Sequence, residues 1–374
     1  MNLLSNLRRP KFLLGGATIV LAIIATVHFS SGPAILVEFI PNPLGGSSTA
    51  FSINNKGQIT GEMSDDGESH AFLWSARDGF TTLHGNEKPI AAATAINEQG
   101  HFAGTLARTK SGTPAVLCTA PDEWLRIGSL GGSDIHPCAI NEQAQVVGWG
   151  KTTTQEAQAF FWSKDKGFIL LGALGGKESK ALDINNQRQI VGYISSATDE
   201  RRAFVWNRGT GFIDLSSFGA HIQLAAAIND TGHIAGEALT PDGETHAFFW
   251  DKENGFTSLG TLGGRHSCAT AINEKGQVVG CSETATGATH AFFWSRETGM
   301  IALGALAGRN SRANDLNDHG QVVGHIELPP PWWVRTWNWI SEKAEFPRSC
   351  RPPEQLKSFR TRAVLWTIPT VEAE

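Results

Sequence analysis

Residues 271–280, AINEKGQVVG, are one copy of a motif that recurs along the whole chain. In this copy Asn273 opens a tight turn and Gly276 closes it, at the position where a left-handed backbone suits glycine. Versions of the turn begin at Asn54, Asn97, Asn141, Asn185, Asn229, Asn273 and Asn317, which are 43 residues apart once and 44 apart in the other five cases. A fixed period of this length is typical of repeat proteins, whose units bury their apolar faces only against neighbouring units.

Each repeat reads as four short strands. Around Asn273 these strands are predicted at 267–272, 277–280, 290–294 and 300–303. The third strand ends in a tryptophan that recurs at 74, 162, 206, 250 and 294, with Cys118 in the equivalent slot of one repeat. Four hairpin-connected strands in about 44 residues match one propeller blade. We therefore predict an all-β, seven-bladed β-propeller over residues 34–374, with an open solenoid as the alternative architecture.

The two ends of the chain predict how the ring closes. The third strand of the last repeat ends at Trp366, and the eight residues that follow leave no room for a fourth strand. A spare strand, Ile35–Ile40, precedes Leu44-Gly45-Gly46 as fourth strands precede similar tripeptides elsewhere. We expect this N-terminal strand to complete the last blade, because closure removes an exposed sheet edge.

Several strings resemble a known bacterial family. HAFLW at 70–74, HAFFW at 246–250 and 290–294, and LGTLGG at 259–264 are similar to the motifs of HAF-repeat proteins, which are presumed to be extracellular. The resemblance covers residues 34–366 and implies export and a repeat architecture. It carries no established enzyme activity. Pro114, Gln158, Arg202 and Arg362 fill the histidine slot in other repeats, so this histidine is not an obligatory chemical group.

The N-terminus predicts contact with a membrane. Arg8, Arg9 and Lys11 precede the uncharged run 12–29, whose 18 residues would form a helix about 27 Å long. That length is close to the hydrocarbon thickness of a bilayer. We predict that residues 1–33 are a signal peptide or signal-anchor transmembrane helix, and we favour the uncleaved anchor. The upstream basic residues place the repeats outside the cytoplasm. The protein is then either anchored in the inner membrane with its repeats in the periplasm, or secreted after cleavage of the segment.

Composition argues against several function classes. The formal net charge of −5 gives no electrostatic case for nucleic acid. We expect no cofactor and no metal, since the sequence has no Gly-x-Ser-x-Gly, HExxH, phosphate-loop or CxxC motif.

Cys268 and Cys281 flank one hairpin, so they are either a candidate disulfide or two small buried residues. Asp183 and Asp315 on innermost strands are expected near the central channel, as hydrated carboxylates or as cation ligands.

The strongest departure from the repeat lies in the last blade. Gly280 and Trp294 are 14 residues apart, whereas Gly324 and Trp366 are 42 apart, so about 326–358 holds an insertion of 28 extra residues. It is expected on the face that carries the loops between blades. The candidate binding residues there are Trp332, Trp333, Arg335, Trp337 and Trp339 of the insertion, with Arg265, His266, Arg309 and Arg312 of the blades.

Tryptophan and arginine dominate recognition surfaces, because each combines a large contact area with a polar group. We therefore expect a binding or scaffold module of the bacterial cell envelope, whose partner is an unknown protein, peptide or glycan on the insertion face. The tryptophans could instead form a packed lid. Two other classes stay open: an extracytoplasmic hydrolase or lyase with its site on this face, and a purely structural envelope protein.

Overall fold

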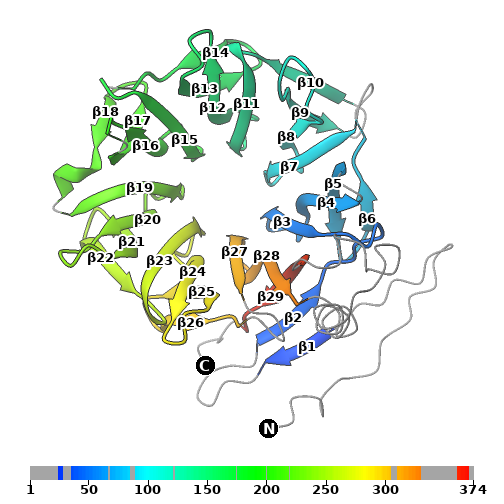
Figure 1. Cartoon of the computed structure of the whole chain (residues 1–374), viewed down its shortest axis with the longest axis vertical. Helices are drawn as coiled ribbons and strands as arrows, with labels where there is room; N and C mark the ends of the chain where they lie inside the picture. Colours follow the sequence, from blue (N-terminus) through cyan, green and yellow to red (C-terminus); the bar gives the residue numbers. More distant parts are fainter. Residues whose placement is uncertain are drawn as a thin grey trace, which may run out of the picture.

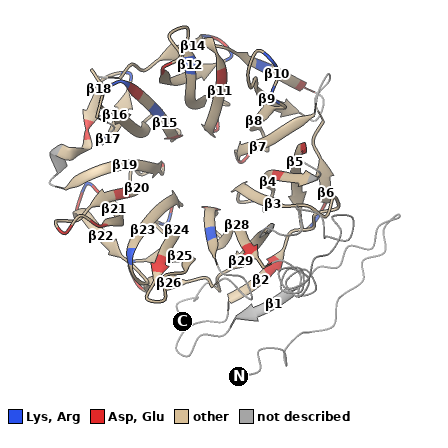
Figure 2. Ribbon diagram, in the orientation of Figure 1, with Lys and Arg blue, Asp and Glu red and all other residues tan. Residues whose placement is uncertain are grey.

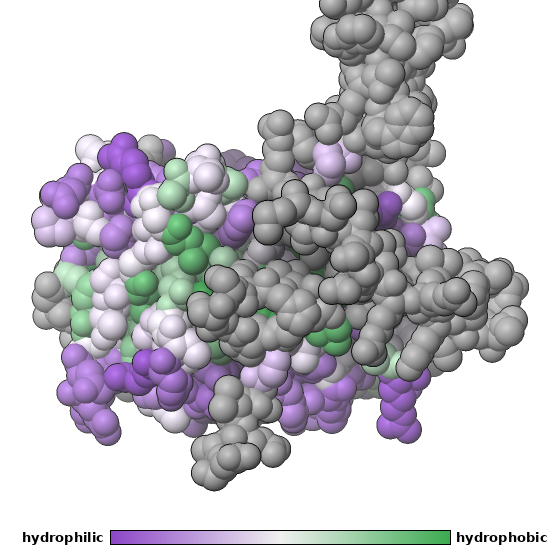
Figure 3. Space-filling model, turned by 90° about the horizontal axis from the view of Figure 1, so that it is seen from below, coloured by the Kyte–Doolittle hydropathy of each residue, from purple (hydrophilic) through white to green (hydrophobic). Residues whose placement is uncertain are grey.

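The computed structural model describes residues 24–27, 35–65, 68–84, 89–120, 123–173, 175–198, 200–218, 220–304, 310–329 and 360–369. Seven antiparallel sheets stand around a central channel, with the first strand of each blade innermost (Figure 1). The predicted seven-bladed β-propeller is confirmed. Polar residues gather on the two flat faces, and apolar residues lie in the band between them (Figure 3).

Six blades are built from four consecutive strands. In chain order the strands are β3 (Ser48–Ile53), β4 (Ile59–Asp65), β5 (Glu68–Ser75) and β6 (Gly79–Thr82); β7 (Ile90–Ile96), β8 (Phe102–Leu106), β9 (Ala115–Ala120) and β10 (Glu123–Gly128); β11 (Gly131–Ile140), β12 (Val146–Thr152), β13 (Ala157–Ser163) and β14 (Gly167–Leu170); β15 (Glu178–Ile184), β16 (Ile190–Ser195), β17 (Arg201–Asn207) and β18 (Gly211–Asp214); β19 (His221–Ile228), β20 (Ile234–Leu239), β21 (Thr245–Asp251) and β22 (Gly255–Gly260); β23 (Gly263–Ile272), β24 (Val278–Thr284), β25 (Thr289–Ser295) and β26 (Gly299–Ala302). A short 3-10 helix, Leu215–Phe218, follows β18.

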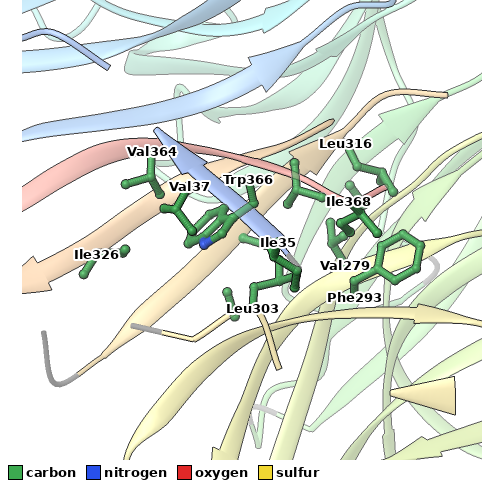
Figure 4. Packing of buried hydrophobic residues seen from close by; sticks show 14 residues of the cluster. Ile35, Val37, Val279, Phe293, Leu303, Leu316, Ile326, Val364, Trp366 and Ile368 are labelled. Carbon is green, nitrogen blue, oxygen red and sulfur yellow. The ribbon is translucent and has the colours of Figure 1, made fainter. Parts of the chain in front are cut away.

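The seventh blade combines both ends of the chain. It contains β27 (Ser311–Leu316), β28 (Gln321–Leu328), β29 (Arg360–Thr367) and the N-terminal β2 (Ile35–Phe39). β2 pairs antiparallel with β29, with Val37 opposite Trp366. Ile35, Val37 and Trp366 are completely buried in one apolar cluster (Figure 4). The predicted closure by the N-terminal strand is confirmed.

The predicted N-terminal helix is not supported. Ile24–Val27, which belong to the uncharged run, form the short strand β1 on the outer edge of β2. A physical reason is that an edge strand presents unpaired backbone groups, and the β-branched residues of this IATV segment suit a strand. The rest of residues 1–33 lies outside the described residues. Among the helices of the described chain, none has the length and apolarity needed to cross a bilayer.

The asparagine turns link neighbouring blades as well as capping themselves. Asn273 Oδ1 accepts hydrogen bonds from the backbone amides of Lys275 and Gln277, which confirms the predicted cap. Its Nδ2 donates 3.1 Å to the carbonyl oxygen of Asn317 in the next blade. The same donation joins Asn54, Asn97, Asn141, Asn185, Asn229, Asn273 and Asn317 into a closed ring, with distances of 2.9–3.4 Å.

The fourth turn residue has a left-handed backbone even where it is not glycine. Ala144 and Arg188 occupy this slot in two blades, with φ of 54° and 62°, compared with 71° at Gly276. The repeated turn geometry therefore overrides the residue's own preference, since the surrounding hydrogen bonds fix the backbone.

The Ala-Phe part of the repeated HAF string lies in the third strand of its blade and is buried. The phenylalanines Phe72, Phe160, Phe204, Phe248 and Phe292 are at most 1% exposed. The alanine before each is equally buried, and it recurs in all seven blades at 71, 115, 159, 203, 247, 291 and 363. These residues pack between blades, so the string is a core signature.

Candidate functional site

The central channel has two chemically different mouths. We call the end at the asparagine turns the turn mouth, and the opposite end the insertion mouth. The loop after Leu328 leaves from the insertion mouth, because Leu328 pairs with Arg360 at the far end of β28 from Asn317. Arg265 at the start of β23 donates from Nε to Glu244, in the loop between β20 and β21, at 2.9 Å. This contact places a residue that follows a loop between blades beside a loop between second and third strands.

The turn mouth is acidic. The residue after each asparagine donates its backbone N–H to a side-chain oxygen of the equivalent residue in the next blade, at 2.8–3.0 Å. This second closed ring consists of Asn55, Glu98, Glu142, Asn186, Asp230, Glu274 and Asp318. A cavity of about 290 Å³ at this end is lined by Glu142, Asp230 and Glu274.

Asp183 and Asp315 lie in the same cavity, as expected for channel residues. Each joins two blades: Asp183 accepts from the backbone amide of Ile228 at 2.8 Å, and Asp315 from that of Ile53 at 2.9 Å. Ser52 Oγ also donates to Asp315 at 2.7 Å. Burial raises the pKa of Asp183 to about 7 and that of Asp315 to about 6, against the lowering effect of these hydrogen bonds. Both carboxylates therefore act as links between blades.

The described residues hold no group of three or more His, Cys, Asp or Glu side chains placed to bind a metal ion. The two aspartates use their oxygens on backbone amides, so the cation reading has no support from this geometry.

A pH dependence follows from the two aspartates. Between pH 3.8 and about 7 the folded state keeps a proton on Asp183 that the unfolded state has released. The unfolding free energy should therefore fall as pH rises through this window and level off above it. We expect a higher melting temperature at pH 5 than at pH 8, and a flatter profile for Asp183→Asn. Asp242 is exposed, so Asp242→Asn is the matched control. Equal profiles of melting temperature against pH for the two variants would contradict the role given to Asp183.

The insertion mouth carries residues that differ from blade to blade. They are cross-strand pairs, one residue five positions before the asparagine and one directly after the glycine of the second strand. The seven pairs are Thr49 and Glu62, Ala92 and Thr105, His136 and Trp149, Lys180 and Tyr193, Leu224 and Glu237, Cys268 and Cys281, and Arg312 and His325. Their third-strand neighbour is the repeated alanine. We call these residues the variable pairs.

In the third and fourth blades the variable pairs form a stack of aromatic rings and cations. The rings of His136 and Trp149 lie parallel, with centroids 4.0 Å apart. Lys180 Nζ lies 4.1 Å from the centroid of Trp149 and 5.9 Å from that of Tyr193. The guanidinium of Arg201 is 4.8 Å from the same Tyr193 centroid. Burial lowers the pKa of His136, and the nearby Lys180 charge adds to this effect.

In the sixth and seventh blades the variable pairs place thiols beside a guanidinium. Cys268 and Cys281 face each other across β23 and β24 with both thiols free, and their sulfurs are 2.7 Å apart. The hydrogen bond from Cys268 lowers the pKa of Cys281, and the Arg312 charge acts in the same direction. The predicted facing of the cysteines is confirmed, while their disulfide stays a prediction. Burial lowers the pKa of His325, whose Nδ1 is buried without a hydrogen-bond partner among the described atoms.

The candidate residues chosen from sequence divide into three groups. Arg265 and His266 lie exposed on the rim of the insertion mouth, where His266 Nδ1 accepts from Thr245 N at 3.3 Å. Arg312 belongs to a variable pair inside that mouth. Arg309, Trp332, Trp333, Arg335, Trp337 and Trp339 lie outside the described residues.

Sequence reasoning missed most variable pairs, including Lys180, Tyr193 and Glu237. A usable signal was present, because aligning the repeats on their asparagines shows that the residue directly after the second-strand glycine varies among acidic, aromatic, hydroxyl, thiol and imidazole side chains.

Comparison with known proteins supports the fold. No protein-family model matches the sequence, and no curated protein sequence does. The β-propeller domain of the Trilobed protease from Pyrococcus furiosus aligns with a TM-score of 0.51 at 12% identity, over 75% of this chain and 91% of that one. TolB from Acinetobacter baumannii gives 0.45 at 11%, over 70% and 64%, and the SapL1 lectin gives 0.41 at 14%, over 70% and 96%. The protein is thus similar to β-propellers in fold.

Proposed function

We propose that this protein is a binding or scaffold module that presents its ligand surface at the insertion mouth. The observation that carries the proposal is the contrast between the framework and the variable pairs. The asparagine turn is repeated in all seven blades, whereas the paired positions hold seven different combinations, rich in aromatic and charged groups. A ligand that lies across several blades would contact a different pair in each.

The insertion extends this proposal. It begins and ends at the insertion mouth, where Leu328 and Arg360 are paired, although its tryptophans lie outside the described residues. We expect Trp332→Ala with Trp333→Ala to weaken partner binding by about 2–4 kcal/mol, as buried aromatic anchors do, with little change in melting temperature. Capture from an envelope fraction and binding to a glycan array provide the measurement.

The matched control is Lys164→Ala with Lys166→Ala, since these exposed lysines lie in a hairpin turn on the opposite face. If the tryptophans form a packed lid instead, each change should lower the unfolding free energy by about 3–5 kcal/mol. A purely structural protein would bind the same material with and without these side chains. A variant that melts early but retains its partner would rule out a binding role for the two rings.

We further propose that the protein works in the bacterial cell envelope. The support is the basic cluster before the uncharged run 12–29, together with the resemblance to HAF-repeat proteins. We expect an alkaline phosphatase fused after residue 374 to be active and a reporter that works only in the cytoplasm to be silent. A mature chain that begins near Ile35 would show that the N-terminal segment is cleaved on export. Fusions with the opposite activities would exclude export.

A further inference from the structure

Three cations of the insertion mouth lack the ion pairs that several other cations of the described chain form. Arg202, Arg265 and Lys151 each lie within 4.0 Å of a carboxylate oxygen. Lys180, Arg201 and Arg312 have no such ion pair among the described residues. Lys180 and Arg201 lie instead against the aromatic rings of Trp149 and Tyr193. An aromatic face can hold a cation in place while leaving its N–H groups available to an anion.

The three cations come from two separated blades, and the two arginines share one electrostatic neighbour. Lys180 and Arg201 belong to the fourth blade, and Arg312 lies on β27 of the seventh. The charges of Arg201 and Arg312 both lower the pKa of Glu237, which burial raises. Glu237 therefore lies in the field of both guanidiniums, although neither forms an ion pair with it. Figure 2 shows basic positions on β15 and β27 beside the channel and an acidic one on β20.

We propose that the insertion mouth contains an anion site, formed by Lys180, Arg201 and Arg312, for a ligand that carries several carboxylates. This inference rests on the proposed binding function and names its ligand chemistry. Guanidinium groups bind carboxylates through paired hydrogen bonds, and a lysine ammonium adds a compact charge. The ligand is either a free polycarboxylate or a glycan with uronic acid units, since both offer the same group.

The charge balance of the mouth favours spaced carboxylates over a dense polyanion. Glu62 and Glu237 belong to the same ring of variable pairs, and burial raises the pKa of both. A chain with a phosphate at every unit would meet these carboxylates as well as the cations. A ligand with separated carboxylates can contact the three cations without placing a negative charge beside either glutamate. Lys180 and Arg201 already contact the rings of Trp149 and Tyr193. The proposed site therefore binds its ligand through the cations, without stacking of the ligand on these rings.

The test is a calorimetric titration of the purified full chain at low salt with three probes: tricarballylate, a galacturonate oligomer and inorganic phosphate. We expect at least one carboxylate probe to bind more tightly than phosphate, and its binding to weaken with added salt. Preference for tricarballylate would indicate a free polycarboxylate, and preference for the oligomer an acidic glycan. Lys180→Gln, Arg201→Gln and Arg312→Gln should each raise Kd about tenfold or more, the effect of losing one charged hydrogen bond.

Arg202→Gln is the matched control, because Arg202 adjoins Arg201 on β17 and pairs with Asp214 on the outer side of the blade. Circular dichroism melts verify that each variant is folded. Tighter binding of phosphate, no binding of either carboxylate at millimolar concentration, or equal Kd values in folded variants would each overturn the site. Such a result would leave the tryptophan-dependent capture of a partner intact, so failure of this site and failure of the binding function are distinguishable.

Discussion

Removal of residues 34–42 is expected to abolish cooperative unfolding of the propeller. This change deletes β2, so the outer edge of β29 loses the strand that pairs with residues 364–367. It also removes Ile35 and Val37, which are completely buried against Trp366. Each of these two aliphatic side chains contributes about 1.5–3 kcal/mol through burial, a large share of the roughly 5–15 kcal/mol that holds an ordinary domain folded.

The matched control for this deletion begins the chain at Ala34 and keeps β2. Comparing it with a chain that begins at Pro43 separates the closing strand from the segment before it. We expect a single sharp melting transition for the longer chain, and aggregation or a broad transition for the shorter one, since an unpaired strand edge promotes association. Superimposable melting curves would show that the ring does not depend on β2.

The fold could be predicted because the residues of each repeat specify its turn and its strands locally. Asn273 and Gly276 specify a turn, and the strands on either side follow from their apolar pattern. The missing fourth strand of the last repeat could be assigned to Ile35–Ile40 by counting alone. The structure shortens that strand by one residue and adds β1 beside it.

The N-terminal segment shows where a single pattern admits two structures. An uncharged run satisfies the length rule for a membrane helix, yet its residues Ile24–Val27 also satisfy the preference of β-strands for branched side chains. The free edge of β2 is available only after the ring has formed. Sequence periodicity carries no information about such an edge.

The candidate site was harder to predict because its contacts join different repeats. Trp149 and Lys180 are separated by a blade boundary, and their contact depends on how two blades stack. The same reason hides the second role of the asparagines. Their local caps follow from turn chemistry, whereas the bond from Asn273 to Asn317 requires the ring geometry.

The second large effect is expected from Gly280→Ala. A Cβ at this position would lie 1.9 Å from the carbonyl oxygen of Cys268 on the adjacent strand, a distance at which the backbone must move. A Cβ added at any of the equivalent glycines would also lie 1.9–2.3 Å from a carbonyl oxygen of the first strand; these glycines are 61, 104, 148, 192, 236 and 324. The irregular pairing between the first two strands produces this close approach, as a β-bulge does. We expect a loss of about 3 kcal/mol in unfolding free energy, the upper range for overpacking.

Gly209→Ala is the matched control, since its nearest neighbour is a side-chain oxygen of Asn207 at 3.3 Å and its turn is on the surface. Its unfolding free energy should stay within about 0.5 kcal/mol of the parent chain, as for most surface changes. Urea denaturation measures both variants. A Gly280→Ala chain as stable as this control would show that the strands separate without penalty. Because Gly280 precedes Cys281 and its added Cβ would displace Cys268, the variant should also shift a variable pair. Framework and site therefore share one geometric requirement: the second-strand glycine lets the first two strands approach closely beside each variable pair.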